Sequence, residues 1–555
     1  MKKIVGLVLA GTIAAGFMSG CSTATSSSGS SSDSSSKAQD SSSGEPVEQV
    51  FTFAGSNDIM TLDVSTLSDE MSALVMYAVN ESLVRYNQDK IIQGIAQSQD
   101  ISEDGKVYTF YLRDAKWSDG QPVTAEDFEY SFFRTLDPAT GSSQVEDFDS
   151  VLNAQAYYSG ELTDASQVGI KALDEKTLEI TLTEEDPFFL SQLAQGVNFY
   201  PIRKDYVEQY GEAYASSPDK FIGCGPFTLT EWAQASSITM EKNESYWDAD
   251  SIKLDKVVEQ IIPDENTRVG MYDLGEVDQV YSISAVQTVN YPEYGSKSGG
   301  TLQHLVFGSR EGQTASNANL RRALSYAIDR AAIVKAIAAP GTTVADRMID
   351  PTITYENKSV AETYPATTGV PENGDVDKAK EYLQAALKDM NLSSAADIPA
   401  LNYVCLDSTT HKQYAEALQA RWQEVLGVNV QINIMPVPQA IGSLLSGEFD
   451  IFLNGQGTGV HPDSLLKNYV SGSGNNYAGW ENEEYSTLMA DEQGNANMEE
   501  RFQQVQKAEQ IILDEAPVAP LWMPGTAYLV NDYVKGLYYG RQTGSIEFIY
   551  AYIEK

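Results

Sequence analysis

The alternation of apolar and polar residues predicts a strand pair followed by a helix over residues 91–134. The run KVYTFYLR alternates in the way a half-buried strand does. Thr124 then opens TAEDFEYSFFRTL with an N-cap residue and acids in the first turn, and Pro138 follows shortly after its end. A second hairpin pattern, VGIKALDEKTLEITLTE, covers residues 168–184.

A helical pattern covers residues 317–341. Its apolar residues recur at the i, i+3, i+4 spacing of a stripe that faces a core, at Leu320, Ala323, Leu324, Ala327, Ile328 and Ala331. Pro340 and Gly341 are expected to end this helix.

Residues 399–453 alternate between strand and helix patterns. LNYVCL, VNVQINI and FDIFLN are typical of strands, and HKQYAEALQARWQEVLG and PQAIGSLLSG are typical of helices, with Gly427 just past the end of the first. This β-α-β-α-β order predicts a parallel sheet with helices on its faces. Ligands of such sheets bind beyond the carboxyl ends of the strands. His411 and the loop 454–461 lie at those ends, so topology nominates both for one ligand-facing rim.

The loop 454–461 reads NGQGTGVH, and glycine-rich turns after strands often hold nucleotide phosphates. Its spacing is G-x-G-x-G, whereas the dinucleotide motif is G-x-G-x-x-G after a first strand, with an acid about 20 residues further on. Here the loop comes late in the chain, and Pro462 follows it closely. We therefore interpret the glycines as serving a tight turn that needs positive φ rather than a phosphate cradle.

Length and charge limit the classes of function. The 555 residues are too many for one compact core and predict two to four lobes. With 37 basic and 78 acidic residues, the net charge is −41, which disfavours binding to nucleic acid. No C-x-x-C pair occurs, and Cys224 and Cys405 are predicted to be separate buried thiols in different lobes.

The first 45 residues carry targeting signals rather than fold. Two lysines, an apolar stretch and small residues over 1–20 are typical of a secretory signal peptide. Met18-Ser19-Gly20-Cys21 resembles a bacterial lipobox, in which the cysteine becomes lipidated and N-terminal after cleavage. The Ser-rich residues that follow, up to 45, cannot bury apolar surface and are predicted to form a disordered linker. We expect a globular body that is tethered outside a bacterial cell membrane.

No catalytic or metal-binding pattern is visible in the sequence. It lacks a P-loop, H-E-x-x-H and G-x-S-x-G, and the three histidines have no metal-ligand spacing. A tethered, extracytoplasmic α/β protein without such a pattern suggests capture of a solute rather than its conversion. A secreted hydrolase is the alternative from another class, because glycosidases also lack short motifs.

A resemblance to a known family becomes specific at YTFYLRDAKWSDGQPVTAEDFEYSFFRTLDPATG, residues 108–141. It continues through FIGCGPFTLTEW, EKNESYWDAD, NLRRALSYAIDRAAIV, HKQYAEALQARWQEVLGVNV, GEFDIF and RFQQVQKAEQIILDEAPVAPLW, in that order. Over nearly all of 46–555 the chain resembles the oligopeptide-binding lipoproteins of ABC importers, which form solute-binding family 5.

This resemblance implies a two-lobed α/β fold of the periplasmic-binding-protein type (type II, cluster C) with an extra subdomain. Lobe I is expected over 46–95, 205–300 and 519–555, the extra subdomain over 96–204, and lobe II over 301–518. Two chain crossings, near 300 and 519, would form the hinge. The resemblance further implies a monomer without enzyme activity or cofactor, which captures peptides and delivers them to membrane permease subunits.

Residues of the ligand site follow from the resemblance one by one. In peptide-binding relatives an acid in lobe II pairs with the peptide amine, and that position falls on Thr458. Pocket positions fall on Val437, Phe452 and Gly455, where this chain also differs, and on the neighbouring Gln456. His411, near the ligand carboxylate in relatives, is retained. The N-terminal positions that line the cleft in relatives are Leu67, Ser68, Asp69 and Glu70.

The changed lobe II residues leave two interpretations open. Neutral Thr458 cannot give the charge-assisted bond that an ammonium group favours, so the pocket would be roomier and would discriminate weakly at the ligand's N-terminus. Alternatively, Asp69 or Glu70 replaces the lost contact. The ligand could also be an oligosaccharide or a metal chelate, or the protein could be a signalling peptide receptor.

Overall fold

The computed structural model describes residues 47–88, 90–355, 358–366, 369–493, 495, 497–540 and 546–555. The predicted signal peptide, the Ser-rich linker and the lipidated Cys21 lie outside these residues. Contacts along the chain gather Val47–Lys555 into one unit. In the part of the chain that is described, no helix is both long and apolar enough to cross a membrane.

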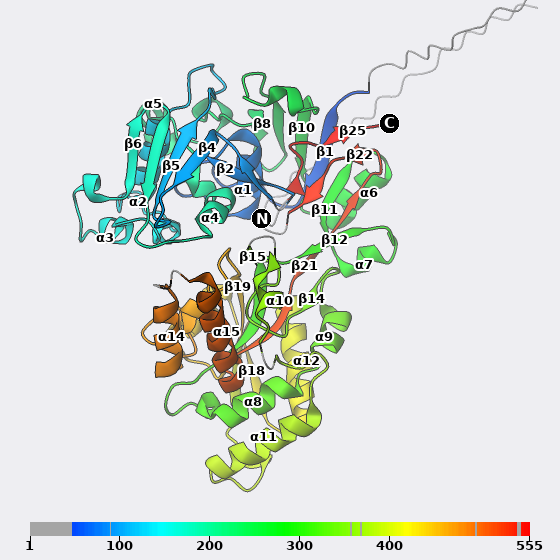
Figure 1. Ribbon diagram of the computed structural model, residues 1–555. Coiled ribbons are helices and arrows are strands. Elements are labelled where there is room, and N and C mark those ends of the chain that lie inside the picture. Colours follow the sequence, from blue (N-terminus) through cyan, green and yellow to red (C-terminus); the bar gives the residue numbers. More distant parts are fainter. Residues whose placement is uncertain are drawn as a thin grey trace, which may run out of the picture. The chain divides into compact units, whose positions relative to one another are not determined.

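Lobe I is built on a seven-stranded sheet with the order β12-β21-β11-β1-β10-β9-β8 (Figure 1). Strand β1 runs parallel to both β10 and β11, so three strands present their carboxyl ends at one edge. The strands are β1 (Val50–Gly55), β8 (Phe227–Ala233), β9 (Ser237–Lys242), β10 (Lys256–Ile261), β11 (Gln279–Ile283), β12 (Gly295–Ser298) and β21 (Gly525–Val530).

Helix α1 (Glu70–Val79) packs on this sheet because most of its side chains are apolar. Asp69 caps its N-terminus and accepts a hydrogen bond from the backbone N–H of Ser72 at 2.8 Å. Leu74 and Val75 are buried in the main core of lobe I, together with Phe51 and Phe53 of β1. The cap therefore fixes the start of α1 beside the carboxyl end of β1.

The extra subdomain follows the predicted order of strand pair, helix and second hairpin. Its antiparallel sheet has the order β4-β5-β7-β6, and α2 packs against β6 and β7. Thr124 and Asp127 form a capping box at the start of α2. The elements are β4 (Ala96–Ile101), β5 (Val107–Leu112), α2 (Ala125–Leu136), β6 (Ile170–Asp174), β7 (Thr177–Thr181) and α4 (Phe189–Gln195).

Lobe II contains the predicted β-α-β-α-β unit. Strand β17 pairs in parallel with both β18 and β19, within a sheet of order β14-β20-β13-β19-β17-β18. The other strands of this sheet are β13 (Thr301–Phe307), β14 (Thr343–Val344) and β20 (Val518–Met523). Helix α12 ends at Gly427, which adopts the left-handed conformation expected there. The unit comprises β17 (Leu401–Leu406), α12 (Thr409–Leu426), β18 (Val430–Met435), α13 (Val437–Ser446) and β19 (Ile451–Gly457).

The single helix predicted over 317–341 is wrong, since the structure has two helices there. Helix α8 (Ala318–Ala327) ends at Ile328, and α9 (Arg330–Ile337) begins after Asp329. The Asp329 side chain accepts a hydrogen bond from the N–H of Ala332 at 2.9 Å and so caps a new helix. The apolar stripe continues across the break, which is why periodicity alone did not reveal it.

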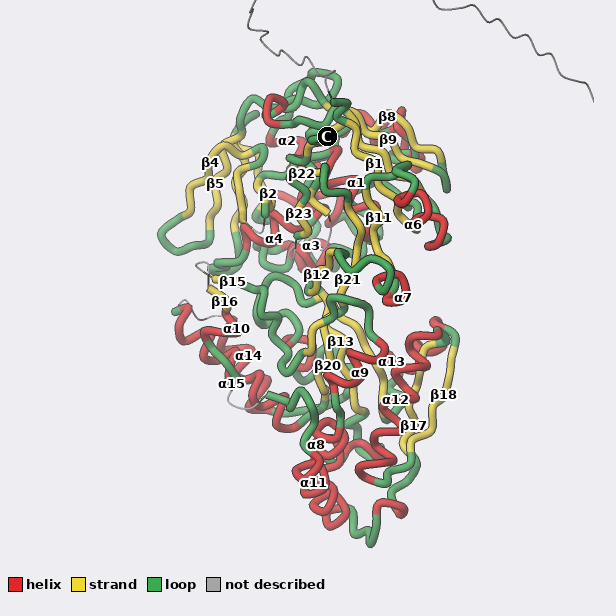
Figure 2. The backbone as a smooth tube through the Cα atoms, turned by 90° about the vertical axis from the view of Figure 1, so that its right-hand side faces the viewer, coloured by secondary structure: helices red, strands yellow, loops and turns green. Residues whose placement is uncertain are grey.

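The chain passes between the two lobes twice (Figure 2). Strand β12 of lobe I leads through Gly299 and Gly300 into β13 (Thr301–Phe307) of lobe II. Strand β20 (Val518–Met523) leads through Pro524 into β21. Because β20 pairs with β13, residues 518–523 belong to the lobe II sheet, and the second crossing lies at Pro524 rather than near 519.

Candidate functional site

Lobe I has a cavity of about 620 Å³ at the carboxyl ends of its parallel strands. Ser56 follows β1, Pro263 follows β10 and Ser282 lies near the end of β11, and all three line the cavity. This is the position at which open α/β sheets bind ligands.

Asp69 and Glu70 also line this lobe I cavity. Glu70 is exposed, and one of its carboxylate oxygens accepts a hydrogen bond from the Tyr281 hydroxyl at 2.5 Å. Of the two predicted residues that precede them, Ser68 is exposed and Leu67 is buried in the main core of lobe I. Asp69 and Glu70 therefore give this wall two carboxylates.

A second cavity, of about 670 Å³, lies at the chain crossings and is lined by both lobes. Lobe I contributes Lys297, Tyr528 and Tyr539, and lobe II contributes Asp346 and Arg347. The rings of Tyr528 and Tyr539 stack with centroids 3.4 Å apart. A solute held here would touch both lobes and both crossings.

Lys297 brings a cation to the wall of the crossing cavity. Burial lowers the pKa of its ammonium to about 8, although Glu70 and Glu547 oppose this change. The ammonium lies over the Tyr281 ring, 5.7 Å from its centroid. Glu70 and Lys297 thus share Tyr281 as a neighbour, and Glu70 on the lobe I cavity interacts electrostatically with Lys297 on the crossing cavity.

Thr458 is buried beside the first crossing rather than exposed to solvent. Its hydroxyl donates a 2.8 Å hydrogen bond to Oδ2 of Asp350, a carboxylate that is itself buried. The Thr458 N–H donates to the Gly300 carbonyl at 3.1 Å. Thr458 is therefore tied to an acid of this chain and to the backbone of the first crossing.

The glycines before Thr458 lie in a strand, so the predicted tight turn over 454–461 is wrong for most of the loop. Strand β19 extends to Gly457, because residues 454–457 pair with β13. Gly455 faces the Gln303 side chain so closely that a Cβ atom would lie 2.4 Å from its amide nitrogen. Only Gly459, with φ of 64°, has the positive φ that the sequence interpretation required.

Three other predicted residues lie apart from both cavities. His411 is half-buried in the first turn of α12, and its Nδ1 lies 2.7 Å from the Ser408 hydroxyl, while burial lowers its pKa. Val437 starts α13 with its side chain 55% exposed. Phe452 lies in a lobe II core, with its ring 5.9 Å from that of Phe449.

The structure thus brings Asp69 and Glu70 to a cavity and aligns His411, Val437 and Gln456 along the carboxyl edge of the lobe II sheet. Gln456 accepts a 3.5 Å hydrogen bond from the Tyr469 hydroxyl. Sequence reasoning missed Lys297 and Asp350. Neither stands in a motif. Lys297 reaches the crossing cavity through the pairing of β12 with β21, and Asp350 reaches Thr458 and Gly300 from a distant part of lobe II.

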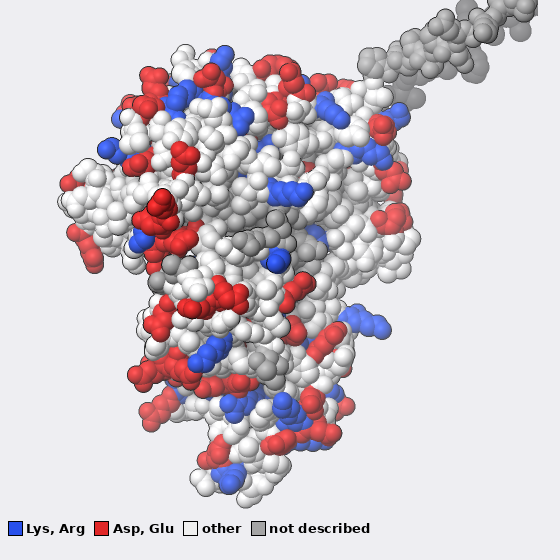
Figure 3. Space-filling model, in the orientation of Figure 1, with Lys and Arg blue, Asp and Glu red and all other residues white. Residues whose placement is uncertain are grey.

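Cys224 and Cys405 are buried free thiols, as predicted. Within the described ranges, no three His, Cys, Asp or Glu side chains are grouped closely enough to hold a metal ion. Acidic and basic side chains are interspersed on the face drawn in Figure 3, and acids gather over α14 (Glu483–Gln493) and α15 (Met498–Glu515).

Two α/β lobes joined by two crossings, with a cavity at the crossings, define a solute-binding protein. Residues 90–477 match the family model described as bacterial extracellular solute-binding proteins, family 5. The chain belongs to this family, whose members are binding proteins.

Relatives and solved structures agree with this assignment. The chain is 32% identical over 500 residues to the oligopeptide-binding protein OppA of Bacillus subtilis, covering 88% of this chain and 89% of that protein. It is similar to an oligopeptide ABC transporter substrate-binding domain from Bacillus anthracis, with 26% identity, a TM-score of 0.74 and coverage of 92% and 99%. It is also similar to Listeria monocytogenes OppA bound to peptide, with 27% identity, a TM-score of 0.73 and coverage of 92% and 100%.

Proposed function

We propose that this protein is the extracytoplasmic receptor of an ABC importer, which captures oligopeptides between its two lobes and delivers them to a membrane permease. The observation that carries the proposal is the cavity at the crossings, with walls from both lobes. A ligand held there contacts both lobes at once and so favours the closed arrangement by its differential affinity for it. The peptide class rests on relatives named for oligopeptide binding.

The receptor is anchored through a lipid on Cys21. The lipobox-like Met18-Ser19-Gly20-Cys21 supports this part of the proposal, together with the Ser-rich residues that follow. A linker of this composition would span roughly 25 Å on average, at about 5–6 Å times the square root of its length. The binding unit would therefore work close to the membrane that holds its permease.

Recognition of the peptide amine differs from the pattern in relatives. The Thr458 hydroxyl already donates to Asp350, and both residues are buried, so a ligand ammonium finds no free carboxylate at this position. Asp58, Asp69 and Glu70 are the acids that line the lobe I cavity. Glu70 is the exposed one, whereas Asp58 already accepts hydrogen bonds from the Trp232 indole and the Ala235 N–H. We infer weak discrimination at the peptide N-terminus, with Glu70 as the residue that would supply any amine preference.

Binding of short alanine peptides of increasing length, each with a free or an N-acetylated amine, tests this inference by calorimetry. We expect each pair of affinities to agree within about tenfold, because a charge-assisted bond to an ammonium is worth roughly 1.5–3 kcal/mol and is missing here. A larger preference for the free amine would contradict weak discrimination. If Glu70→Gln then removed that preference, the amine contact would lie in lobe I.

Incubation with the same peptides also distinguishes a receptor from a hydrolase. A receptor binds one equivalent and returns the peptide unchanged, so mass spectrometry after long incubation should find no product. If no peptide of any length binds, the peptide class fails, whatever the outcome of the acetylation comparison.

A further inference from the structure

The subdomain reaches lobe II through a short segment, Glu184-Glu185-Asp186-Pro187-Phe188, just before α4. The segment is fixed to the subdomain. Asp186 Oδ1 accepts a hydrogen bond from the N–H of Phe188 at 2.9 Å, and the Asp186 carbonyl accepts one from the Tyr108 hydroxyl of β5 at 3.0 Å. These two hydrogen bonds hold the segment 184–188 on the subdomain, so the segment is expected to move with it.

The side chain of Phe188 leaves the subdomain and packs in lobe II. It is 2% exposed and shares a cluster with four buried lobe II residues, which we call the Phe188 socket: Ile353, Val360, Val460 and Phe502. Its ring centroid is 6.2 Å from that of Phe502 and 5.1 Å from that of His461. The next residue, Phe189, is buried in the subdomain core instead, so two consecutive phenylalanines belong to cores on opposite sides of the contact.

Polar and charged side chains of both parts meet beside the socket. Asp186 Oδ2 of the subdomain lies 3.6 Å from Nε2 of His461 in lobe II. Arg501 of α15 interacts electrostatically with both Glu184 and Asp186, in addition to its 3.2 Å ion pair with Glu492. The subdomain thus presents acids where lobe II presents His461 and Arg501, and the lobe II acids Asp463 and Glu492 lie in the same group of charges.

This contact is separate from the chain crossings and from both cavities. Helix α4 lies near the hairpin β15–β16 (Thr354–Tyr355 and Lys358–Ser359) in both backbone views (Figures 1 and 2). Among the described residues, those that line the two cavities include neither Phe188 nor any member of its socket. A change at this contact can therefore alter the lobe arrangement without removing a cavity wall.

We propose that the segment 184–188 is a latch, which seats Phe188 in the lobe II socket and holds the subdomain and lobe II together when the lobes close. The crossings are covalent, whereas this contact is not, so it is the part that can release. When the lobes separate, the Phe188 ring and its socket become exposed to water and the contact between Asp186 and His461 is lost. The closed arrangement is thereby favoured even before a ligand adds its own contacts.

Interlobe distances in the ligand-free protein test the latch. Spin labels are placed on Glu161→Cys in the subdomain and Asp491→Cys in α14, both at exposed positions, in the full chain carrying Cys21→Ser. The buried Cys224 and Cys405 should take no label. In Phe188→Ala, we expect the ratio of short to long distances, measured by pulsed electron resonance, to fall by about tenfold or more. Burying a phenylalanine ring is worth at least one tenfold step.

Two further variants provide a control and a second way to disrupt the same contact. Phe133→Ala is the matched control. Phe133 meets Tyr157 edge-to-face inside the subdomain, 5.7 Å between centroids, so its removal should leave the interlobe distances unchanged. If Phe188→Ala does not fold, Phe502→Ala removes the socket side of the same contact and should give the same shift. An unchanged distance distribution in a folded Phe188→Ala or Phe502→Ala protein overturns the latch. This outcome does not depend on which ligand the receptor takes.

Discussion

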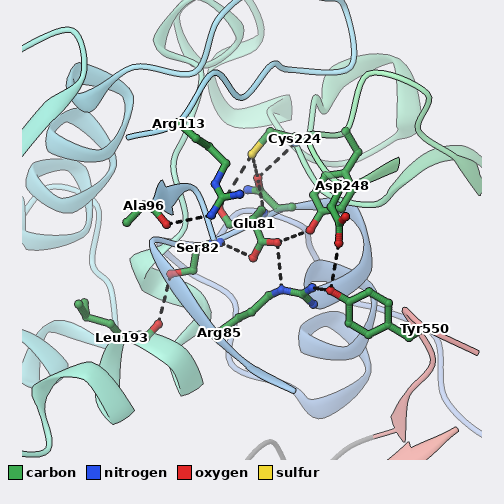
Figure 4. A network of polar contacts seen from close by, with 11 residues as sticks. Glu81, Ser82, Arg85, Ala96, Arg113, Leu193, Cys224, Asp248 and Tyr550 are labelled. Carbon is green, nitrogen blue, oxygen red and sulfur yellow. Dashed lines mark hydrogen bonds and ion pairs between the residues drawn. The ribbon is translucent and has the colours of Figure 1, made fainter. Parts of the chain in front are cut away.

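Replacing Glu81 by alanine should lower the free energy of unfolding of lobe I by about 3–5 kcal/mol, because it leaves a buried guanidinium without its partner. Glu81 and Arg85 are both buried, and Oε2 of Glu81 lies 3.2 Å from Nε of Arg85 (Figure 4). The same carboxylate accepts a 2.6 Å hydrogen bond from the Tyr246 hydroxyl. Burial raises the pKa of Glu81 and Arg85 opposes that rise, so the pair is stable only as a unit.

This network also attaches the C-terminal segment to lobe I. Arg85 donates a hydrogen bond to the Tyr550 hydroxyl, which in turn lies 3.4 Å from Asp248. Urea unfolding followed by tyrosine and tryptophan fluorescence measures the loss. Glu241→Ala is the control, since Glu241 pairs with Lys256 on the exposed surface of the same lobe and should change stability by about 0.2–1 kcal/mol at most. Equal effects of the two substitutions would refute the assigned role of the buried pair.

The second large effect is expected for Gly525→Ala, at the start of β21 just after the second crossing. A Cβ atom at this position would lie 2.2 Å from backbone atoms of Gly341 and of Thr342, and backbone cannot move aside as a flexible side chain can. Gly525 also pairs with Ser298, at the end of the first crossing strand. Overpacking of this kind costs about 1–3 kcal/mol and should displace the two crossings relative to each other.

The overpacking at Gly525→Ala should lower stability to urea. The displaced crossings should weaken binding of the alanine peptides described above, and both effects can be measured. Gly442→Ala provides the matched control. Gly442 is exposed within α13, and nothing lies within 4 Å of an added Cβ, so alanine should stabilise the helix by about 0.5–1 kcal/mol. A Gly525→Ala protein with unchanged stability and affinity would show that the crossings tolerate a shift there.

The sequence predicts the elements of lobe II best where local chemistry and periodicity agree. Helix α12 has a serine cap at Ser408 and a left-handed glycine at Gly427, and the strands on either side of it pair in parallel as their order requires. Similarly, the capping box of Thr124 and Asp127 marks α2 without reference to the rest of the fold. In these cases the signals lie within a few residues of one another.

Predictions fail where a distant segment decides the local structure. The stripe over 317–341 hides the break at Ile328 and Asp329, because the apolar face continues through both helices. The glycines of 454–457 form a strand only because β13 pairs with them. The bond between Thr458 and Asp350 joins residues 108 positions apart, and no short-range pattern encodes it. The candidate site is therefore less predictable than the fold, since it is assembled at the meeting of two crossings.

Native mass spectrometry of the protein purified from cells without added ligand shows directly what the protein captures. An oligopeptide receptor should carry a ladder of bound masses that correspond to peptides of varied sequence, held in one copy per protein and released on unfolding. One discrete mass that fits no peptide, such as an oligosaccharide or a metal chelate, would contradict it.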